Sequence, residues 1–178
     1  MSEEVLAFWF EETGPRNWWV VDPAFDQLLR DRFLPLLQQA AAGELYGWRS
    51  GARGRLAEII VLDQFSRNIH RGTRHAFSQD PQALVLSQEA VAAGALHELG
   101  EAERTFLLMP YMHSESRAIH IQAEALFKEF TPTGNYEFEL RHKGIVDRFG
   151  RYPHRNAILG RDSTDEELEF LRQPGSSF

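Results

Sequence analysis

Residues 56–70, LAEIIVLDQFSRNIH, constrain the fold of this chain more than any other stretch. At 100° per residue, their apolar side chains occur nearly all the way round a helix. These side chains are Leu56, Ile59, Ile60, Val61, Leu62, Phe65 and Ile69. A helix that is apolar on every side is packed by neighbours on every side, so the sequence predicts a central helix enclosed by others.

Helix signals recur along the rest of the chain, whereas strand signals do not. Asp22-Pro23 and Asp80-Pro81 each supply an N-cap followed by proline at the first helical position. We predict helices over 5–10, 23–43 with Pro35 as a kink or break, 52–70, 80–94, 101–109, 114–130 with Ser114 as N-cap, and 136–149 ended by Gly150. Ser163 with Glu166 predicts a capping box that opens a final short helix.

Successive helices joined by short loops stack as antiparallel hairpins, which predicts an all-α fold. The chain length fits one compact domain, which we place over residues 1–172, followed by a flexible tail over 173–178. The stretch AAAGEL at 40–45 is echoed by VAAGAL at 91–96. Hairpin repeats build right-handed superhelices, although this echo occurs only once and without a 34-residue period.

Composition excludes several classes of protein. The chain has no cysteine, which removes thiol nucleophiles, Cys-based zinc sites, iron–sulfur clusters and a secreted disulfide scaffold. The first residues, MSEEVLAFWFEE, carry acids where a signal peptide needs positive charge, and their apolar run is too short to span a bilayer. We therefore expect a cytoplasmic protein without membrane contact.

Charge is unevenly distributed along the chain. The net charge of −7 argues against generic binding to a phosphate backbone, so a nucleic-acid partner is not expected. Residues 141–161 are nevertheless basic, since they contain six arginines or lysines and only one acid, Asp147. A local basic surface on an acidic protein suits a small, defined anion.

Asp63, Arg67 and His70 share one arc of the central helix with Leu56 and Ile60, which predicts that they point inward. Asp63 and Arg67 are four residues apart and can pair. A buried charge must either form an ion pair or serve a function such as ligand binding, because an unpaired buried charge costs several kcal/mol. The pair is either a structural salt bridge or the floor of a polar pocket that presents Arg67 to an anion.

The stretch PYMHSES at 110–116 places His113 beside a predicted helix start. Capping and the helix dipole account for Ser114 and Glu115 without any ligand. On a continuing helix, His113 falls with Arg117, His120 and Glu124 on a polar face. Free N–H groups beside a histidine also suit an anion.

The stretch RFGRYPHRNAILGR at 148–161 contains four arginines, a histidine and an asparagine around a proline turn. Arginine forks bind carboxylate or phosphate in a bidentate manner. This basic loop either binds a ligand or docks on acidic helices elsewhere in the chain.

Motifs for several enzyme classes are absent from the sequence. There is no G-x-S-x-G elbow, no P-loop, no G-x-G-x-x-G and no His-Glu-x-x-His. Glu139 and His142 form one Glu-x-x-His, whereas a di-iron bundle needs two. We therefore expect neither a bound metal nor a cofactor.

FWF near the start, LDQFSRN, PYMHSES and RFGRYPHRNAILGR together resemble the family known as domain of unknown function 924. The resemblance covers nearly the whole chain. It implies an all-α fold like the tetratricopeptide-repeat superhelices, in a mostly bacterial family without an established activity. Ser66 stands where a proline is common in the family, and Tyr111-Met112 replaces a more usual Pro-Leu-Glu run.

The family's pattern marks ten residues of this chain as site candidates. They are Asp63, Gln64, Arg67, Asn68, His113, Ser114, Glu115, His154, Arg155 and Asn156.

Our leading hypothesis is a pocket for a small anionic ligand. In it Arg67 and Arg155 bind the anion, Asn68 and Asn156 orient it, and Asp63 and Glu115 hold the arginines, with Gln64 and Ser114 as further ligand-binding candidates. His113 or His154 is the candidate general acid or base, because histidine titrates near neutral pH. Hydrolysis or transfer at a phosphate or carboxylate ester would suit such a site.

A rival hypothesis is a tetratricopeptide-like scaffold whose arginines clamp the carboxylate of a peptide or protein partner. RNA binding through residues 141–161 is a third, and it would show a steep dependence on salt. The sequence leaves open whether any reaction is catalysed, which ligand is bound, and what the oligomeric state is.

Overall fold

A helical rod over residues 52–69 runs through the centre of the fold. It consists of α4 (Ala52–Ile60), the π-helical turn η3 (Val61–Phe65) and α5 (Ser66–Ile69), with right-handed helical backbone angles at both junctions. Every residue from 56 to 66 is buried. The prediction that neighbouring elements enclose this helix is therefore confirmed.

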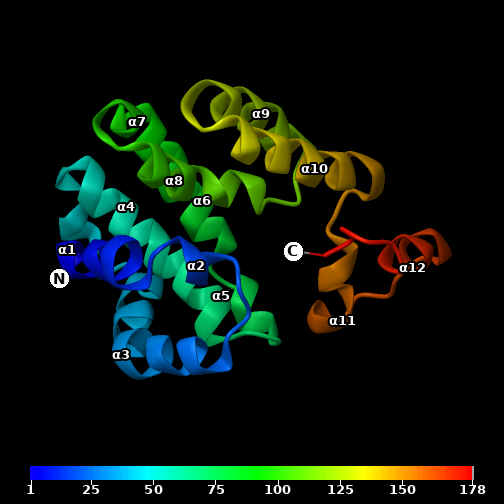
Figure 1. Ribbon diagram of the computed structural model, residues 1–178, viewed down its shortest axis with the longest axis horizontal. Coiled ribbons are helices and arrows are strands. Elements are labelled where there is room, and N and C mark those ends of the chain that lie inside the picture. The colour runs from blue at the N-terminus through cyan, green and yellow to red at the C-terminus, as the bar shows by residue number, and fades with distance from the viewer. Residues whose placement is uncertain (178) are drawn as a thin grey trace.

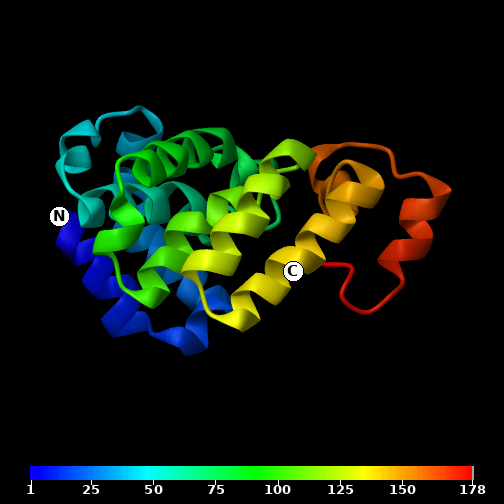
Figure 2. The ribbon, with the colours of Figure 1, turned by 90° about the horizontal axis from the view of Figure 1, so that it is seen from above.

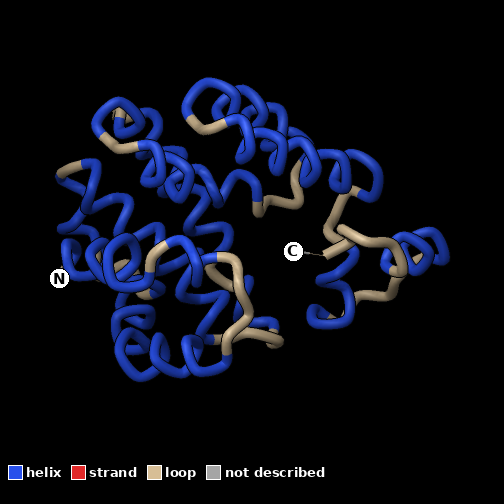
Figure 3. Tube along the Cα trace, viewed as in Figure 1, coloured by secondary structure: helices blue, strands red, loops and turns tan. Residues whose placement is uncertain are grey.

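The computed structural model of the chain describes residues 1–177 and, over that range, contains helices and turns but no strand (Figures 1 and 3). The predicted all-α fold is confirmed. The other α-helices are α1 (Ser2–Ala7), α2 (Pro15–Trp18), α3 (Pro23–Ala41), α6 (Asp80–Ala92), α7 (Ala95–Glu98), α8 (Glu101–Met112), α9 (Arg117–Phe130), α10 (Thr133–Phe149), α11 (Asn156–Leu159) and α12 (Asp165–Leu171). A second π-helical turn, η1 (Phe8–Thr13), and the 3-10 turns η2 (Tyr46–Ser50), η4 (Arg74–Phe77) and η5 (Pro153–Arg155) lie between them.

Two apolar cores of unequal size hold these helices together. The larger core joins elements from α1 to α9 around Trp9, Phe65, Phe106 and Phe127. The smaller core contains Ile145, Val146 and Tyr152, with Phe149 and Phe170 packed against it. Figures 1 and 2 accordingly show α12 at one end of the long axis, beyond the end of α10, and in Figure 1 α11 lies below the end of α10.

Two predicted helix starts were wrong by one or two residues. Ser116, not Ser114, is the N-cap of α9, and the Ser114 hydroxyl accepts a hydrogen bond from the Ser116 N–H at 3.2 Å. The capping box of α12 is formed by Thr164 and Glu167. The start of α6 at Asp80 is as predicted, but its N-cap is Gln79 and not Asp80.

Neither internal proline ends its helix. Pro35 lies within α3, and Pro110 lies within α8, which continues to Met112. The prediction that α8 would end at Met109 was therefore wrong. Burial explains this result, because residues 105–112 of α8 are all buried and tertiary packing outweighs the local cost of one missing hydrogen bond.

The π-helical turn at 61–65 changes the direction of the side chains that follow it. A π-turn inserts one residue into an α-helix, so later residues rotate away from their places on an ideal wheel. His70 consequently does not join Asp63 and Arg67, as the wheel predicted, but is half-buried with its ring centroid 5.7 Å from that of His75.

The extent of the domain and the flexibility of the tail at 173–178 stay predictions. Residues 173–177 form turns in which the Ser176 hydroxyl donates to the Leu171 carbonyl at 3.2 Å, and residue 178 lies outside the described range. The likeness to a tetratricopeptide superhelix also stays a prediction. Among residues 1–177, no helix has the length and apolar character needed to cross a bilayer.

Close contact between α4 and η2 requires glycine at position 54. A Cβ atom on Gly54 would lie 2.0 Å from the Trp48 carbonyl oxygen. We expect Gly54→Ala to lower the free energy of unfolding by about 1–3 kcal/mol, because overpacking forces the backbone to move. Urea denaturation measures this change.

The matched control for that variant is Gly144→Ala, in the middle of α10, where an added Cβ meets no heavy atom within 4 Å. Alanine is favoured over glycine inside a helix by about 1 kcal/mol, so this variant should be as stable as the parent or more stable. Equal losses of stability in both variants would contradict the packing explanation.

Candidate functional site

The carboxylate of Asp63 is a buried meeting point for side chains from separate elements. Its Oδ1 accepts a hydrogen bond from Arg67 at 2.9 Å and lies 2.7 Å from Nδ1 of His113, which follows α8. Its Oδ2 accepts from the Gln64 amide at 2.6 Å. The Asp63 side chain is only 1% exposed, so these three partners replace water.

Electrostatics decide which protons this cluster holds. Burial alone would raise the pKa of Asp63, but the neighbouring Arg67 and His113 hold it at about 2, so the carboxylate is ionised at neutral pH. The pKa of His113 is lowered by burial and by the charge of Arg67. Since an ionised carboxylate only accepts hydrogen bonds, neutral His113 carries its proton on Nδ1 and leaves Nε2 as an acceptor.

Asp80 is a second shared carboxylate, at the start of α6. Arg67 binds it in a bidentate manner, at 2.9 Å to Oδ1 and 3.0 Å to Oδ2. Arg155 approaches the same Oδ2 from η5, at the longer distance of 3.4 Å. Arg67 is thereby committed to two carboxylates, Asp63 and Asp80, while Arg155 is held only loosely.

Two aromatic rings fix the guanidinium group of Arg155. Its central carbon lies 4.7 Å from the ring centroid of Phe77 and 4.6 Å from that of Tyr152. The residue is only 4% exposed, and its Nε has no hydrogen-bond partner among the described residues. Burial and the nearby Arg67 lower the pKa of Arg155, which indicates an incompletely satisfied cation.

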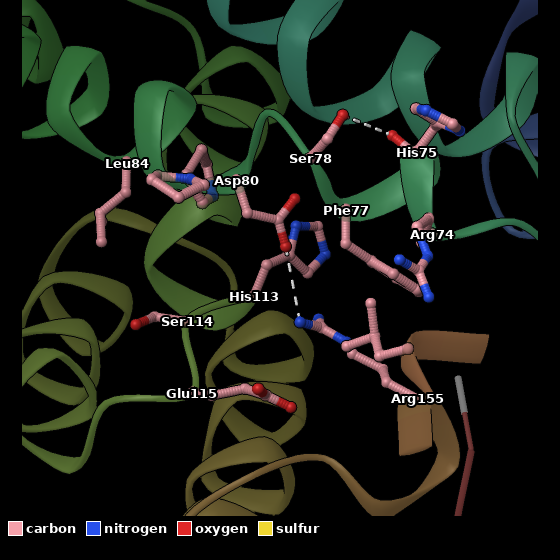
Figure 4. A pocket seen from close by; sticks show the side chains of 13 residues that line it. Arg74, His75, Phe77, Ser78, Asp80, Leu84, His113, Ser114, Glu115 and Arg155 are labelled. Carbon is pink, nitrogen blue, oxygen red and sulfur yellow. Dashed lines mark hydrogen bonds and ion pairs between the residues drawn. The ribbon is translucent and has the colours of Figure 1, made fainter. Parts of the chain in front are cut away.

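An open pocket of about 630 Å³ lies against these groups. Its wall comes from η4 and α6 on one side, from the end of α8 and the following loop on another, and from η5 and α11 on a third. Figure 4 shows Asp80, His113 and Arg155 pointing toward one another within it. The lining residues are Arg74, His75, Phe77, Ser78, Asp80, Pro81, Leu84, Pro110, His113, Ser114, Glu115, Arg155 and Leu159.

Four of the ten predicted site residues line this pocket, namely His113, Ser114, Glu115 and Arg155. Asp63, Gln64 and Arg67 lie behind its wall and position His113 and Asp80 through the contacts above. The three polar blocks of the sequence therefore meet in space, but only the second and third blocks contribute residues to the pocket lining, and the first lies behind it.

The two asparagines do not line the pocket, contrary to the predicted orienting role. Asn68 donates to the Gln64 carbonyl at 2.9 Å and accepts from Arg71 at 2.7 Å. Asn156 donates to the Ser163 hydroxyl at 3.0 Å and accepts from Arg161 at 3.0 Å. Each amide is thus held by other groups of the protein.

Glu115 holds Arg161, and not Arg67 or Arg155 as predicted. Arg161 donates to both of its oxygens, at 2.6 and 2.9 Å, and the Tyr152 N–H donates at 2.7 Å. Arg151 likewise pairs with Glu167 at 2.6 Å. Most of the basic loop at 148–161 therefore docks on acidic groups. This was the alternative to ligand binding that the sequence left open for the loop.

The other histidines predicted near the site are placed differently from His113. His154 does not line the pocket; burial and Arg155 lower its pKa to about 4. His120 was predicted to share a polar face with His113, but it is fully buried and its Nδ1 lies 2.7 Å from Glu139. The prediction assumed one continuous helix, whereas a loop at 113–116 separates the two histidines. Within residues 1–177 no three acidic or imidazole groups are arranged to hold a metal ion.

Sequence reasoning missed Asp80, Phe77 and Arg74 as pocket residues. Asp80 was interpreted as a helix cap, and nothing in the 13-residue spacing from Arg67 predicts their pairing. The sequence offered only an indirect signal for Asp80. Because Asp63 is shared between Arg67 and His113, Arg67 needs a second carboxylate to complete its pairing.

A family model described as "Bacterial protein of unknown function (DUF924)" matches residues 5–175. No curated protein matches the chain significantly. The chain is also similar to a solved structure, of a protein of unknown function from Agrobacterium tumefaciens, with 38% sequence identity and a TM-score of 0.91. That match covers 96% of each chain.

Removing the charge of Asp63 tests its place at the centre of the cluster. We expect Asp63→Asn to lower the free energy of unfolding by about 3 kcal/mol, because Arg67 loses the buried one of its two carboxylate partners. Urea denaturation at pH 7.5 measures it. The control, Glu166→Gln, breaks an ion pair with Arg148 in which both side chains are about half exposed or more, and should have a far smaller effect.

Stability should fall as the pH decreases below about 6.5. His142 and His154 have pKa values lowered by burial to about 3 and about 4, so in this range the unfolded chain binds more protons than the folded one. Each histidine then contributes a loss on the order of 1 kcal/mol per pH unit until its folded pKa is reached. Urea denaturation between pH 7.5 and 4.5 measures the slope.

His154→Gln should reduce that slope, whereas His97→Gln, at an exposed position, should leave it unchanged. An unchanged slope in the His154 variant would contradict the depressed pKa of this group.

Proposed function

This chain belongs to the DUF924 family of bacterial proteins of unknown function, and we propose that its pocket binds a small anionic ligand beside a histidine base. In this proposal Arg155 attracts the negative charge. His113 accepts a hydrogen bond or a proton from the ligand or from a water molecule, and Asp63 orients His113.

One observation carries the proposal. The ionised Asp63 lies 2.7 Å from Nδ1 of His113, and the pocket that His113 lines is also lined by Arg155. A carboxylate on Nδ1 fixes the tautomer and stabilises the imidazolium that forms when Nε2 takes a proton. A purely structural salt bridge would not need a histidine at the edge of an open pocket.

Hydrolysis of an ester is the reaction that this arrangement suits. Nε2 of His113 would remove a proton from water as the water oxygen attacks the carbonyl carbon or phosphorus of the ester. Arg155 would stabilise the negative charge that develops on the carbonyl oxygen or the non-bridging phosphoryl oxygen. His113 would then return the proton to the bridging oxygen as it leaves with the alcohol. The same pocket without this step would be a binding site only.

Binding of simple anions tests the proposal. We expect a simple monoanion such as acetate or formate to shift the imidazole NMR signals of His113 in a saturable manner. Arg155→Met should weaken that binding at least tenfold, because the methionine keeps apolar contact with Phe77 and Tyr152 but carries no charge. Arg148→Met, at an exposed position paired with Glu166, is the control and should bind as the parent does.

Undiminished anion binding in Arg155→Met would overturn the proposal. Native mass spectrometry of the protein purified from cells addresses the alternative, a scaffold for a peptide or protein. A stoichiometric polypeptide partner would favour the scaffold, and a co-purifying metabolite would favour the pocket.

A further inference from the structure

The charges around the pocket restrict the class of anion that fits it. Arg67 is neutralised by Asp63 and Asp80, and Arg161 by Glu115. Asp80 and Glu115 themselves line the pocket and already hold these arginines, so a ligand group with two negative charges would lie beside both carboxylates with the loosely held Arg155 as the nearest cation to offset them. The electrostatics therefore favour an anion that carries a single charge.

Two cations remain available to a ligand. Arg155 has only the long contact of 3.4 Å to Asp80, and its buried Nε has no partner among the described residues. Arg74 lines the pocket, is exposed, and forms no ion pair within the described chain. Its Nη2 lies 3.7 Å from the Cβ position of Gly160, which places this second cation at the mouth between η4 and α11.

The edge of the Arg155 guanidinium matches a planar acceptor. Its central carbon lies 4.7 and 4.6 Å from the ring centroids of Phe77 and Tyr152, and Nη1 is directed at Asp80, so among the described residues no ion pair occupies the edge formed by Nε and Nη2. A carboxylate accepts from such an edge with two parallel hydrogen bonds. The long Asp80 contact is the one that a ligand carboxylate would replace.

The remaining wall is mostly apolar. Phe77, Pro81, Leu84, Pro110 and Leu159 line the pocket around the charged groups. Its volume of about 630 Å³ exceeds what a lone phosphate or acetate occupies and lies within the usual range for small-molecule sites. The ligand should therefore carry an apolar part next to its anionic group.

We propose that the ligand class is a monocarboxylate with a short apolar chain. Its carboxylate binds the free edge of Arg155, and its chain contacts Phe77, Leu84 and Leu159. This inference rests on the proposed function, since it assigns a ligand class to the same pocket. It goes further in excluding doubly charged phosphate monoesters as preferred ligands.

Two matched pairs of probes test the inference by isothermal titration calorimetry at pH 7.5. Hexanoate and hexyl phosphate share a chain and differ in the charged group, whereas hexanoate and acetate share the charged group and differ in the chain. We expect hexanoate to bind at least tenfold more tightly than either of the others. Asp80→Asn should reduce the preference over hexyl phosphate, because it removes one of the two repelling carboxylates.

A second variant keeps the test decisive if Asp80→Asn fails to fold. Leu84→Asn changes a half-buried residue of α6 that lines the pocket and should weaken hexanoate binding severalfold while leaving acetate binding unchanged. The control, Val85→Asn, changes the next residue, which is 56% exposed and does not line the pocket, and should leave both affinities unchanged.

The outcomes separate this inference from the proposed function. If hexyl phosphate binds as tightly as hexanoate or more tightly, and Arg155→Met abolishes that binding, the ligand class is wrong and the anion pocket stands. If hexanoate binds no better than acetate, the apolar contact is wrong. If none of the probes binds in an Arg155-dependent manner, both the inference and the proposed function fail.

Discussion

The buried carboxylate of Asp63 is the interaction on which the rest of the site depends. An ionised group that is nearly inaccessible to water is tolerated only when it is fully hydrogen-bonded, and Gln64, Arg67 and His113 meet that demand. Because Asp63 belongs to the central rod, its partners are fixed relative to the largest apolar core. The same contacts set the tautomer of His113 and leave its Nε2 as a hydrogen-bond acceptor.

A second carboxylate extends this cluster to the far end of the chain. Asp80 accepts from Arg67 in the helical body and from Arg155 in the segment after α10, which has its own small core. Glu115 makes a parallel link through Arg161. Most of the basic segment of an otherwise acidic protein thus docks on acidic groups, and among the four ion pairs of Arg148, Arg151, Arg155 and Arg161 that of Arg155 is the longest, at 3.4 Å.

Several elements could be predicted from local patterns, and their errors have physical causes. The all-round apolar helix and the Gly150 end of α10 follow from periodicity and capping chemistry, which act within a few residues. The continuation of α8 through Pro110 could not be predicted, because burial of its last turn outweighs a local breaker. His70 was misplaced because an inserted π-turn leaves no signal in an ideal wheel.

The sequence alone determined the all-α fold, the buried Asp63–Arg67 pair and the three polar blocks, since all of these depend on spacing along one helix or on residue type. Tertiary structure decided which members of the blocks meet. It placed Asp80 between Arg67 and Arg155, turned Asn68 and Asn156 toward other partners, and put His113 on Asp63 across 50 residues of chain. Such pairings are set by how helices pack and by which charges must neutralise one another in the interior, and neither is encoded in local spacing.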